Sequence, residues 1–94
     1  MTDYEQQVEV GTEIIRAELA RIADDLSVPR LLGLKFMVTD RDFDFERVSL
    51  VDAERSKIVT KIERDDLADS VADEVVRHRM TCRLEAAVRS YLAT

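Results

Sequence analysis

The spacing of the apolar residues changes twice along these 94 residues, and this change constrains the fold more than any other feature. Before Pro29, the one proline, apolar residues recur at helical spacing. Between 31 and 63 they alternate with polar residues at the period of a strand, and from residue 66 onward the helical spacing returns. This order predicts a single α+β domain over 1–94, with helices packed against a small antiparallel sheet.

Residues 2–27 are predicted to form one long helix. Its apolar stripe consists of Tyr4, Val8, Ile15, Leu19, Ile22 and Leu26. Thr2 and Glu5 fit the capping-box pattern, which satisfies free amide groups at a helix start. Pro29 disfavours helical geometry in the residue before it, so the helix is expected to stop at the end of this range. Gly11 lowers helix propensity by about 1 kcal/mol relative to alanine, and we expect it to mark a bend or a looser first turn.

Three strands are predicted in the alternating segment. The first covers 31–39, where one face is expected to carry Leu32, Leu34, Phe36 and Val38. The second covers 43–52 and the third covers Lys57–Glu63. A short polar segment, 52–56, separates the second strand from the third and suits a hairpin connection. The predicted sheet is therefore a three-stranded antiparallel meander.

Residues 66–92 are predicted to be helical, but their apolar residues form two stripes on roughly opposite sides of a helical wheel. One stripe contains Leu67, Val71, Val75 and Cys82, and the other contains Met80, Leu84, Val88 and Tyr91. Either the helix breaks around 77–79, or one continuous helix buries two faces. A chain of this size has little material to cover both faces, so the second option predicts a homodimer. The predicted interface is Met80, Leu84, Val88 and Tyr91, together with Ile15, Leu19 and Ile22 of the first helix.

The composition excludes several classes of protein. With 46% hydrophobic residues the chain has enough apolar material for a core, which excludes intrinsic disorder. Cys82 is the single cysteine, which excludes a disulfide scaffold, and no apolar stretch is long enough for a membrane span. The first ten residues show no secretory pattern, so we expect a cytoplasmic location. The formal net charge of −6 argues against a general nucleic-acid binder, because phosphate binding needs a basic face.

The acidic run 40–46 opens like a calcium-binding EF-hand loop, with aspartate at alternate positions. The match fails at two decisive positions, because Phe45 replaces the glycine of the sharp turn and Val51 replaces the bidentate glutamate. We therefore interpret the run as a charged strand or turn edge with Phe43 and Phe45 turned inward.

His78 and Cys82 are four residues apart on the last predicted helix, with Glu74 one turn earlier. Zinc normally needs three or four protein ligands, and a nucleophilic cysteine needs a third group that orients the histidine. The sequence also lacks a glycine-rich phosphate loop. We therefore predict no catalytic residues, no cofactor and no metal, and keep an enzyme or ligand carrier built on Cys82 and His78 as the last alternative.

Arginines concentrate near the point where the last helix changes its apolar face. They are scattered around the helical wheel, but Arg79 and Arg83 of two subunits could combine into one basic patch. The first functional hypothesis is a non-enzymatic protein-interaction or structural protein that acts as a homodimer. The alternative is a nucleic-acid-associated protein that uses Arg79 and Arg83 across the dimer.

Overall fold

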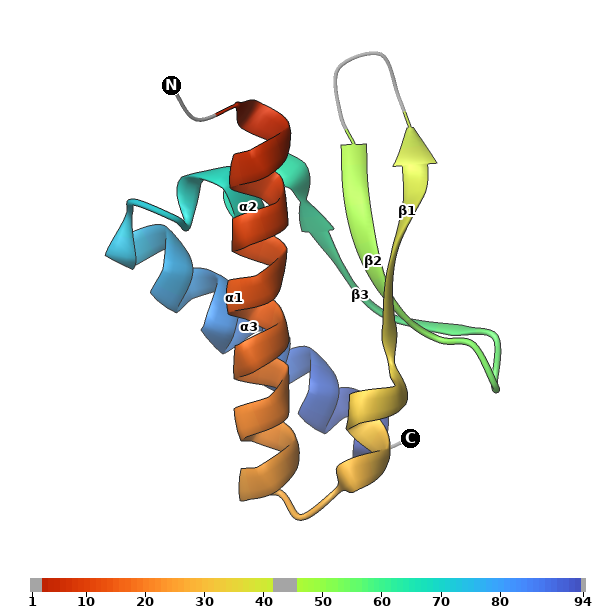
Figure 1. The fold of residues 1–94 in the computed structure, drawn as a ribbon. Coiled ribbons are helices and arrows are strands. Elements are labelled where there is room, and N and C mark those ends of the chain that lie inside the picture. Colours follow the sequence, from red (N-terminus) through yellow and green to blue (C-terminus); the bar gives the residue numbers. More distant parts are fainter. Residues whose placement is uncertain (1–2, 42–45, 94) are drawn as a thin grey trace.

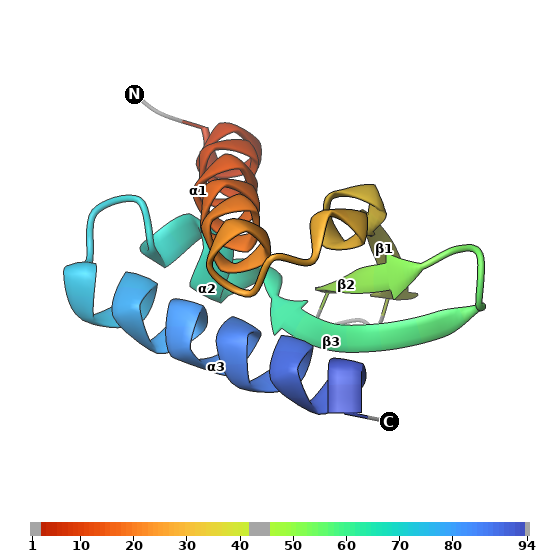
Figure 2. The same cartoon turned by 90° about the horizontal axis from the view of Figure 1, so that it is seen from below.

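The computed structural model describes residues 3–41 and 46–93 and confirms the predicted order of helix, antiparallel sheet and helix (Figure 1). The elements are α1 (Tyr4–Asp25), the 3-10 helix η1 (Pro29–Gly33), β1 (Lys35–Arg41), β2 (Glu46–Asp52), β3 (Lys57–Glu63), α2 (Arg64–Asp69) and α3 (Glu74–Ala93). The strands form a meander with β2 in the centre. Figure 2 shows α3 running beside β3, and α1 seen nearly end-on above α2.

Helix α1 begins and ends slightly inside its predicted range. Its N-cap is Asp3, whose carboxylate accepts a hydrogen bond from the amide of Glu5 at 3.3 Å. The predicted cap, Thr2, lies outside the described residues. At the other end Ser27 has a φ of 56°, and this left-handed residue turns the chain toward Pro29 after the helix has stopped at Asp25.

Gly11 does not mark a bend, because α1 continues through it as one helix. It is buried where α1 crosses α2, and an added Cβ would stand 1.9 Å from the carbonyl oxygen of Leu67. A side chain at this position would therefore collide with the backbone of α2. The glycine allows the two helices to approach closely, which the sequence-based interpretation missed.

The first strand begins later than predicted. Pro29 starts the 3-10 helix η1, so residues 31–33 are not extended and the alternation assigned to them was wrong. Leu31 is buried, whereas Leu32, which was predicted to face the core, is 62% exposed. The second strand begins at Glu46, and the predicted inward side chains of Phe43 and Phe45 lie outside the described residues.

Successive side chains of each strand point to opposite sides of the sheet, so one face of the sheet contacts the core and the other points away from it. In register, Phe36 lies opposite Leu50 and Leu50 lies opposite Thr60, and this row points toward the helices. Leu50 is fully buried, and it packs in one core with residues of α1, α2 and α3. The next row, Met37, Ser49 and Lys61, belongs to the opposite face.

The predicted C-terminal helix is broken, but at residues 70–73 rather than at 77–79. The hydroxyl of Ser70 donates to the carbonyl of Leu67 at 2.7 Å, and the carboxylate of Asp73 accepts from the amide of Val75 at 2.9 Å to cap α3. Arg77 donates back to the carbonyl of Ser70 at 3.0 Å and so holds the corner. The first apolar stripe is therefore split, with Leu67 buried on α2, Val71 in the corner, and Val75 and Cys82 exposed on α3. Helix α3 buries only the second stripe, so it does not need a partner to cover two faces.

Candidate functional site

The seven residues predicted as a dimer interface lie in or beside the core of the single chain. Six of them are at most 5% exposed, namely Ile15, Leu19, Ile22, Met80, Leu84 and Val88. Tyr91 is half-buried, and its hydroxyl donates a hydrogen bond to Asp52. A partner could reach the six buried side chains only if the core opened. Any surface for a partner must therefore lie elsewhere on the molecule.

Arg79 and Arg83 are exposed on α3, one helical turn apart. The structure brings Arg83 together with Arg47 and Lys61, because all three line a cavity of about 250 Å³ between β3 and α3. Two carboxylates, Glu63 and Asp66, line the same cavity and reduce its positive charge. Arg79 is not part of this lining. A basic cluster thus exists on one chain, but its composition differs from the predicted pair.

His78 and Cys82 are neighbours on the exposed side of α3, with 3.5 Å between Nε2 and Sγ. The sequence spacing correctly places them together. Within residues 3–41 and 46–93, however, no group of three or more histidine, cysteine, aspartate or glutamate side chains could hold a metal ion. In the part of the chain that the structure describes, His78 forms no other side-chain hydrogen bond, so no third group there orients it for nucleophilic chemistry.

The sheet has one face that no helix covers among the described residues. In Figure 1 the helices lie to the left of the sheet, and the side opposite them carries no other element. Met37 and Ile58 are 49% and 51% exposed on this side, and Val51 is half-buried in register between Lys35 and Ile58. Large apolar side chains are therefore exposed on the two outer strands of this face, while the central strand contributes the half-buried Val51 and the buried Ser49.

Positive charge surrounds these apolar residues. Lys35, Arg47 and Lys61 alternate with them on the outer face and are exposed, while Glu63 lies opposite Arg47 at one end. We call this surface, made of Lys35, Met37, Arg47, Val51, Ile58 and Lys61, the open sheet face. The chain as a whole has a formal net charge of −6. Three basic residues thus lie on this face of an acidic protein, and Asp40 and Glu63 lie opposite Arg47 in the register.

Acidic residues concentrate on a different side of the molecule. Glu5, Glu9 and Glu13 line a shallow groove along the exposed side of α1, together with the half-exposed Val10. Arg16 lies at the end of this groove, where its guanidinium pairs with Glu13 at 2.6 Å. The two regions place basic residues on the outer face of the sheet and acidic residues along the exposed side of α1.

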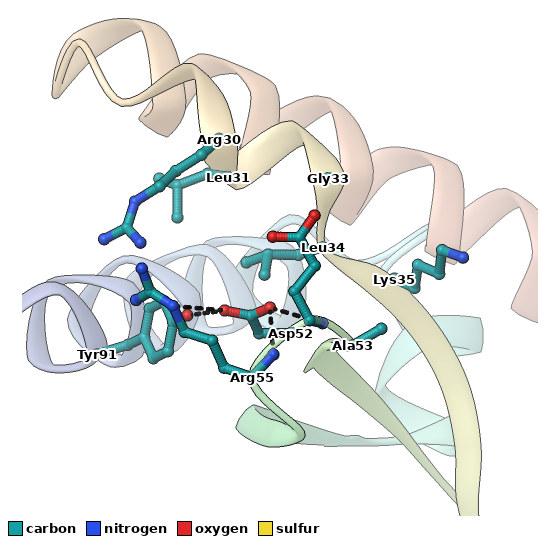
Figure 3. A pocket seen from close by; sticks show the side chains of 10 residues that line it. Arg30, Leu31, Gly33, Leu34, Lys35, Asp52, Ala53, Arg55 and Tyr91 are labelled. Carbon is teal, nitrogen blue, oxygen red and sulfur yellow. Dashed lines mark hydrogen bonds and ion pairs between the residues drawn. The ribbon is translucent and has the colours of Figure 1, made fainter.

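A second concave site lies between η1, the β2–β3 turn and the end of α3 (Figure 3). Asp52 is at its centre and accepts hydrogen bonds from the hydroxyl of Tyr91 and from the amides of Glu54 and Arg55, the last two at 3.2 and 3.3 Å. The Tyr91 hydrogen bond is the main reason why the pKa of Asp52 is lowered. The same bond to the carboxylate raises the pKa of Tyr91.

Sequence reasoning missed both the open sheet face and the Asp52 site. The sequence contains one indication of the open sheet face. All three lysines of the chain fall between residues 35 and 61, and two of them occupy outward positions of strands. The sequence contains no indication of the contact between Asp52 and Tyr91, because the two residues are 39 positions apart and belong to different elements.

Comparison with models of protein families, with curated proteins and with solved structures gave no match. In the described part of the chain, no helix has both the length and the apolar character needed to span a membrane.

Proposed function

We propose that this chain is a non-enzymatic protein-interaction module, and that an acidic, partly apolar segment of a partner protein binds to its open sheet face. The observation that carries the proposal is the composition of this face, where exposed Met37 and Ile58 stand among Lys35, Arg47 and Lys61. An exposed apolar patch with a charged rim is typical of a protein-binding surface. Charge of one sign on the rim favours partners of the opposite sign.

The charge of the face also bears on self-association. Two copies packed face to face would bring Lys35, Arg47 and Lys61 of one copy toward the same residues of the other, and like charges in an interface are unfavourable. A copy that offered its acidic α1 groove instead would make a head-to-tail contact, which gives a ring or an open fibre rather than a simple dimer. Both arguments favour a different protein as the occupant.

The homodimer itself stays a prediction, and its surface would have to differ from the buried residues named above. Val75, which is 74% exposed on α3, is one apolar residue that a copy could cover. Sedimentation velocity at micromolar concentration tests it, and a strict monomer would remove the dimer. A cytoplasmic location also stays part of the proposal, since the exposed thiol of Cys82 suits a reducing compartment.

A selection from a random peptide library on the immobilised protein tests the proposed partner chemistry. We expect enrichment of peptides in which aspartate or glutamate alternates with apolar residues. A Met37→Glu/Ile58→Glu double variant should lose this enrichment, because it reverses the character of the face without touching the core. A Val75→Glu variant is the matched control and should select the same peptides as wild type. Selection of basic peptides, or equal selection by the double variant, would refute the proposal.

A nucleic-acid partner is the second candidate, and one observation favours it. Arg83 shares a cavity with Arg47 and Lys61, and Arg79 lies one turn away on the same exposed side of α3, so several cations are near one another on a single chain. Fluorescence anisotropy with labelled single-stranded RNA and DNA tests this function. Binding should weaken steeply with salt and should fall in an Arg79→Gln/Arg83→Gln variant. Affinity that the double substitution leaves unchanged would remove the candidate.

A further inference from the structure

We propose that the pocket between η1, the β2–β3 turn and the end of α3 binds a small organic monoanion, a carboxylate on an apolar body, through the guanidinium groups of Arg30 and Arg55. This site shares only Lys35 with the open sheet face and does not depend on the function proposed for that face. Its volume of about 420 Å³ lies within the range of small-molecule sites. It is assembled from three parts of the chain that are distant in sequence.

The two arginines approach the pocket from different elements. Arg30 comes from η1 and Arg55 from the β2–β3 turn, and Figure 3 shows both guanidinium groups on the Tyr91 side of the pocket. Lys35 also lines the pocket, but Figure 3 shows its amine pointing away from the two arginines. Arg30 and Arg55 are therefore the cations that could face one bound group together.

Neither guanidinium is fully used by the protein. Arg30 is exposed and forms no side-chain hydrogen bond or ion pair with the residues that the structure describes. Arg55 forms an ion pair with Asp52, with 3.9 Å between its Nε and a carboxylate oxygen, and its side chain also hydrogen-bonds Tyr91. Asp52 already accepts three hydrogen bonds, from Tyr91 and two backbone amides. N–H donors of both arginines thus remain for a ligand, and a carboxylate matches their planar geometry.

The remaining lining defines the rest of the ligand. Leu31 is buried and Leu34 is half-buried in the wall, and the ring of Tyr91 borders the same space, so an apolar body could lie against them. Lys35 points away, so the two arginines are balanced by the acids Asp52 and Glu54 of the lining. A ligand with a single negative charge suits the site better than a dianion, because a second negative charge would add repulsion from these carboxylates.

NMR titration of the isotope-labelled protein tests the site, with benzoate, phenyl phosphate and benzyl alcohol as probes at constant ionic strength. We expect benzoate to give saturating shifts at the amides of Gly33, Ala53 and Tyr91. Removal of one charge-assisted contact in an Arg30→Gln or Arg55→Gln variant should weaken benzoate binding about tenfold. Both arginines are exposed, so both variants should fold, and thermal melts verify this. An Arg89→Gln variant on the exposed side of α3 is the matched control and should bind as wild type does.

The outcomes separate cleanly. Saturation with benzoate that depends on Arg30 and Arg55 but not on Arg89 supports the site. Absence of saturation, equal binding of neutral benzyl alcohol, or an equal loss in the Arg89→Gln control would overturn it. Tighter binding of phenyl phosphate than of benzoate would overturn the assignment to a monoanion.

Discussion

Replacement of Gly11 by alanine should destabilise the protein, although alanine is the better helix former. The substitution gains about 1 kcal/mol of helix propensity within α1. The new Cβ, however, would stand 1.9 Å from the carbonyl oxygen of Leu67 and 2.5 Å from its carbonyl carbon, whereas real Cβ contacts closer than 3.0 Å essentially never occur. The α1 and α2 backbones must therefore separate by about 1 Å or more. Overpacking of this kind typically lowers the free energy of unfolding by about 1–3 kcal/mol. We expect a value of about 3 kcal/mol here, because the new Cβ meets backbone atoms, which cannot rotate away as a side chain can.

The net expected loss is about 2 kcal/mol in the free energy of unfolding, after the gain in propensity has offset part of the strain. For a domain of this length such a loss lowers Tm by roughly 8–16 °C. Urea and thermal unfolding followed by circular dichroism measure it. Gly33→Ala is the matched control, since its Cβ would have nothing within 4 Å, and it should change stability by less than about 1 kcal/mol. A Gly11→Ala protein as stable as wild type would refute the close approach of α1 and α2.

Three further predictions follow from the same packing. Leu84→Ala, at a 1% exposed position, should lower the free energy of unfolding in urea by about 2–5 kcal/mol. Val75→Ala, on the exposed side of α3, is the control and should change it by less than about 0.5 kcal/mol. Equal effects of the two substitutions would contradict the assigned core face of α3. Asp73→Ala removes the cap of α3 and should cost about 1 kcal/mol, while Asp73→Asn should retain most of it. Tyr91→Phe removes the hydrogen bond that lowers the pKa of Asp52 and raises the pKa of Tyr91. The loss of stability should therefore be greatest between about pH 4 and pH 10, where Asp52 is ionised and Tyr91 is protonated. That loss should shrink as the pH falls through the lowered pKa of Asp52, and a loss independent of pH would argue against the bond.

The fold class could be predicted because it depends on periodicity, which is a local property of the sequence. The stripe from Val8 to Ile22 and the alternation in Lys57–Glu63 each produced the element that the pattern indicates. Errors arose where local geometry competes with that pattern. Pro29 starts a 3-10 turn inside a segment that alternates like a strand, and Asp73 caps a new helix inside a segment that looks continuously helical.

The candidate sites were harder to predict from the sequence, because they depend on which surfaces remain uncovered after the elements pack. The sequence indicated surplus apolar surface on the last helix and assigned it to a dimer. In the structure the corner at 70–73 moves Leu67 onto a separate helix and leaves Val75 exposed, and Met80, Leu84 and Val88 complete the core of one chain. The unsatisfied surface is instead on the sheet, where only the register reveals which side chains share the outer face.

The central claim, that the open sheet face binds an acidic partner segment, is tested most directly by mapping a bound peptide with NMR chemical shifts. The probe is a synthetic extended peptide of alternating glutamate and valine, with an alternating lysine and valine peptide as its control. The account predicts saturating shifts at Met37, Val51 and Ile58 with the acidic peptide alone, and loss of these shifts in the Met37→Glu/Ile58→Glu variant. Shifts along the acidic groove of α1, or equal shifts with the lysine peptide, would contradict it.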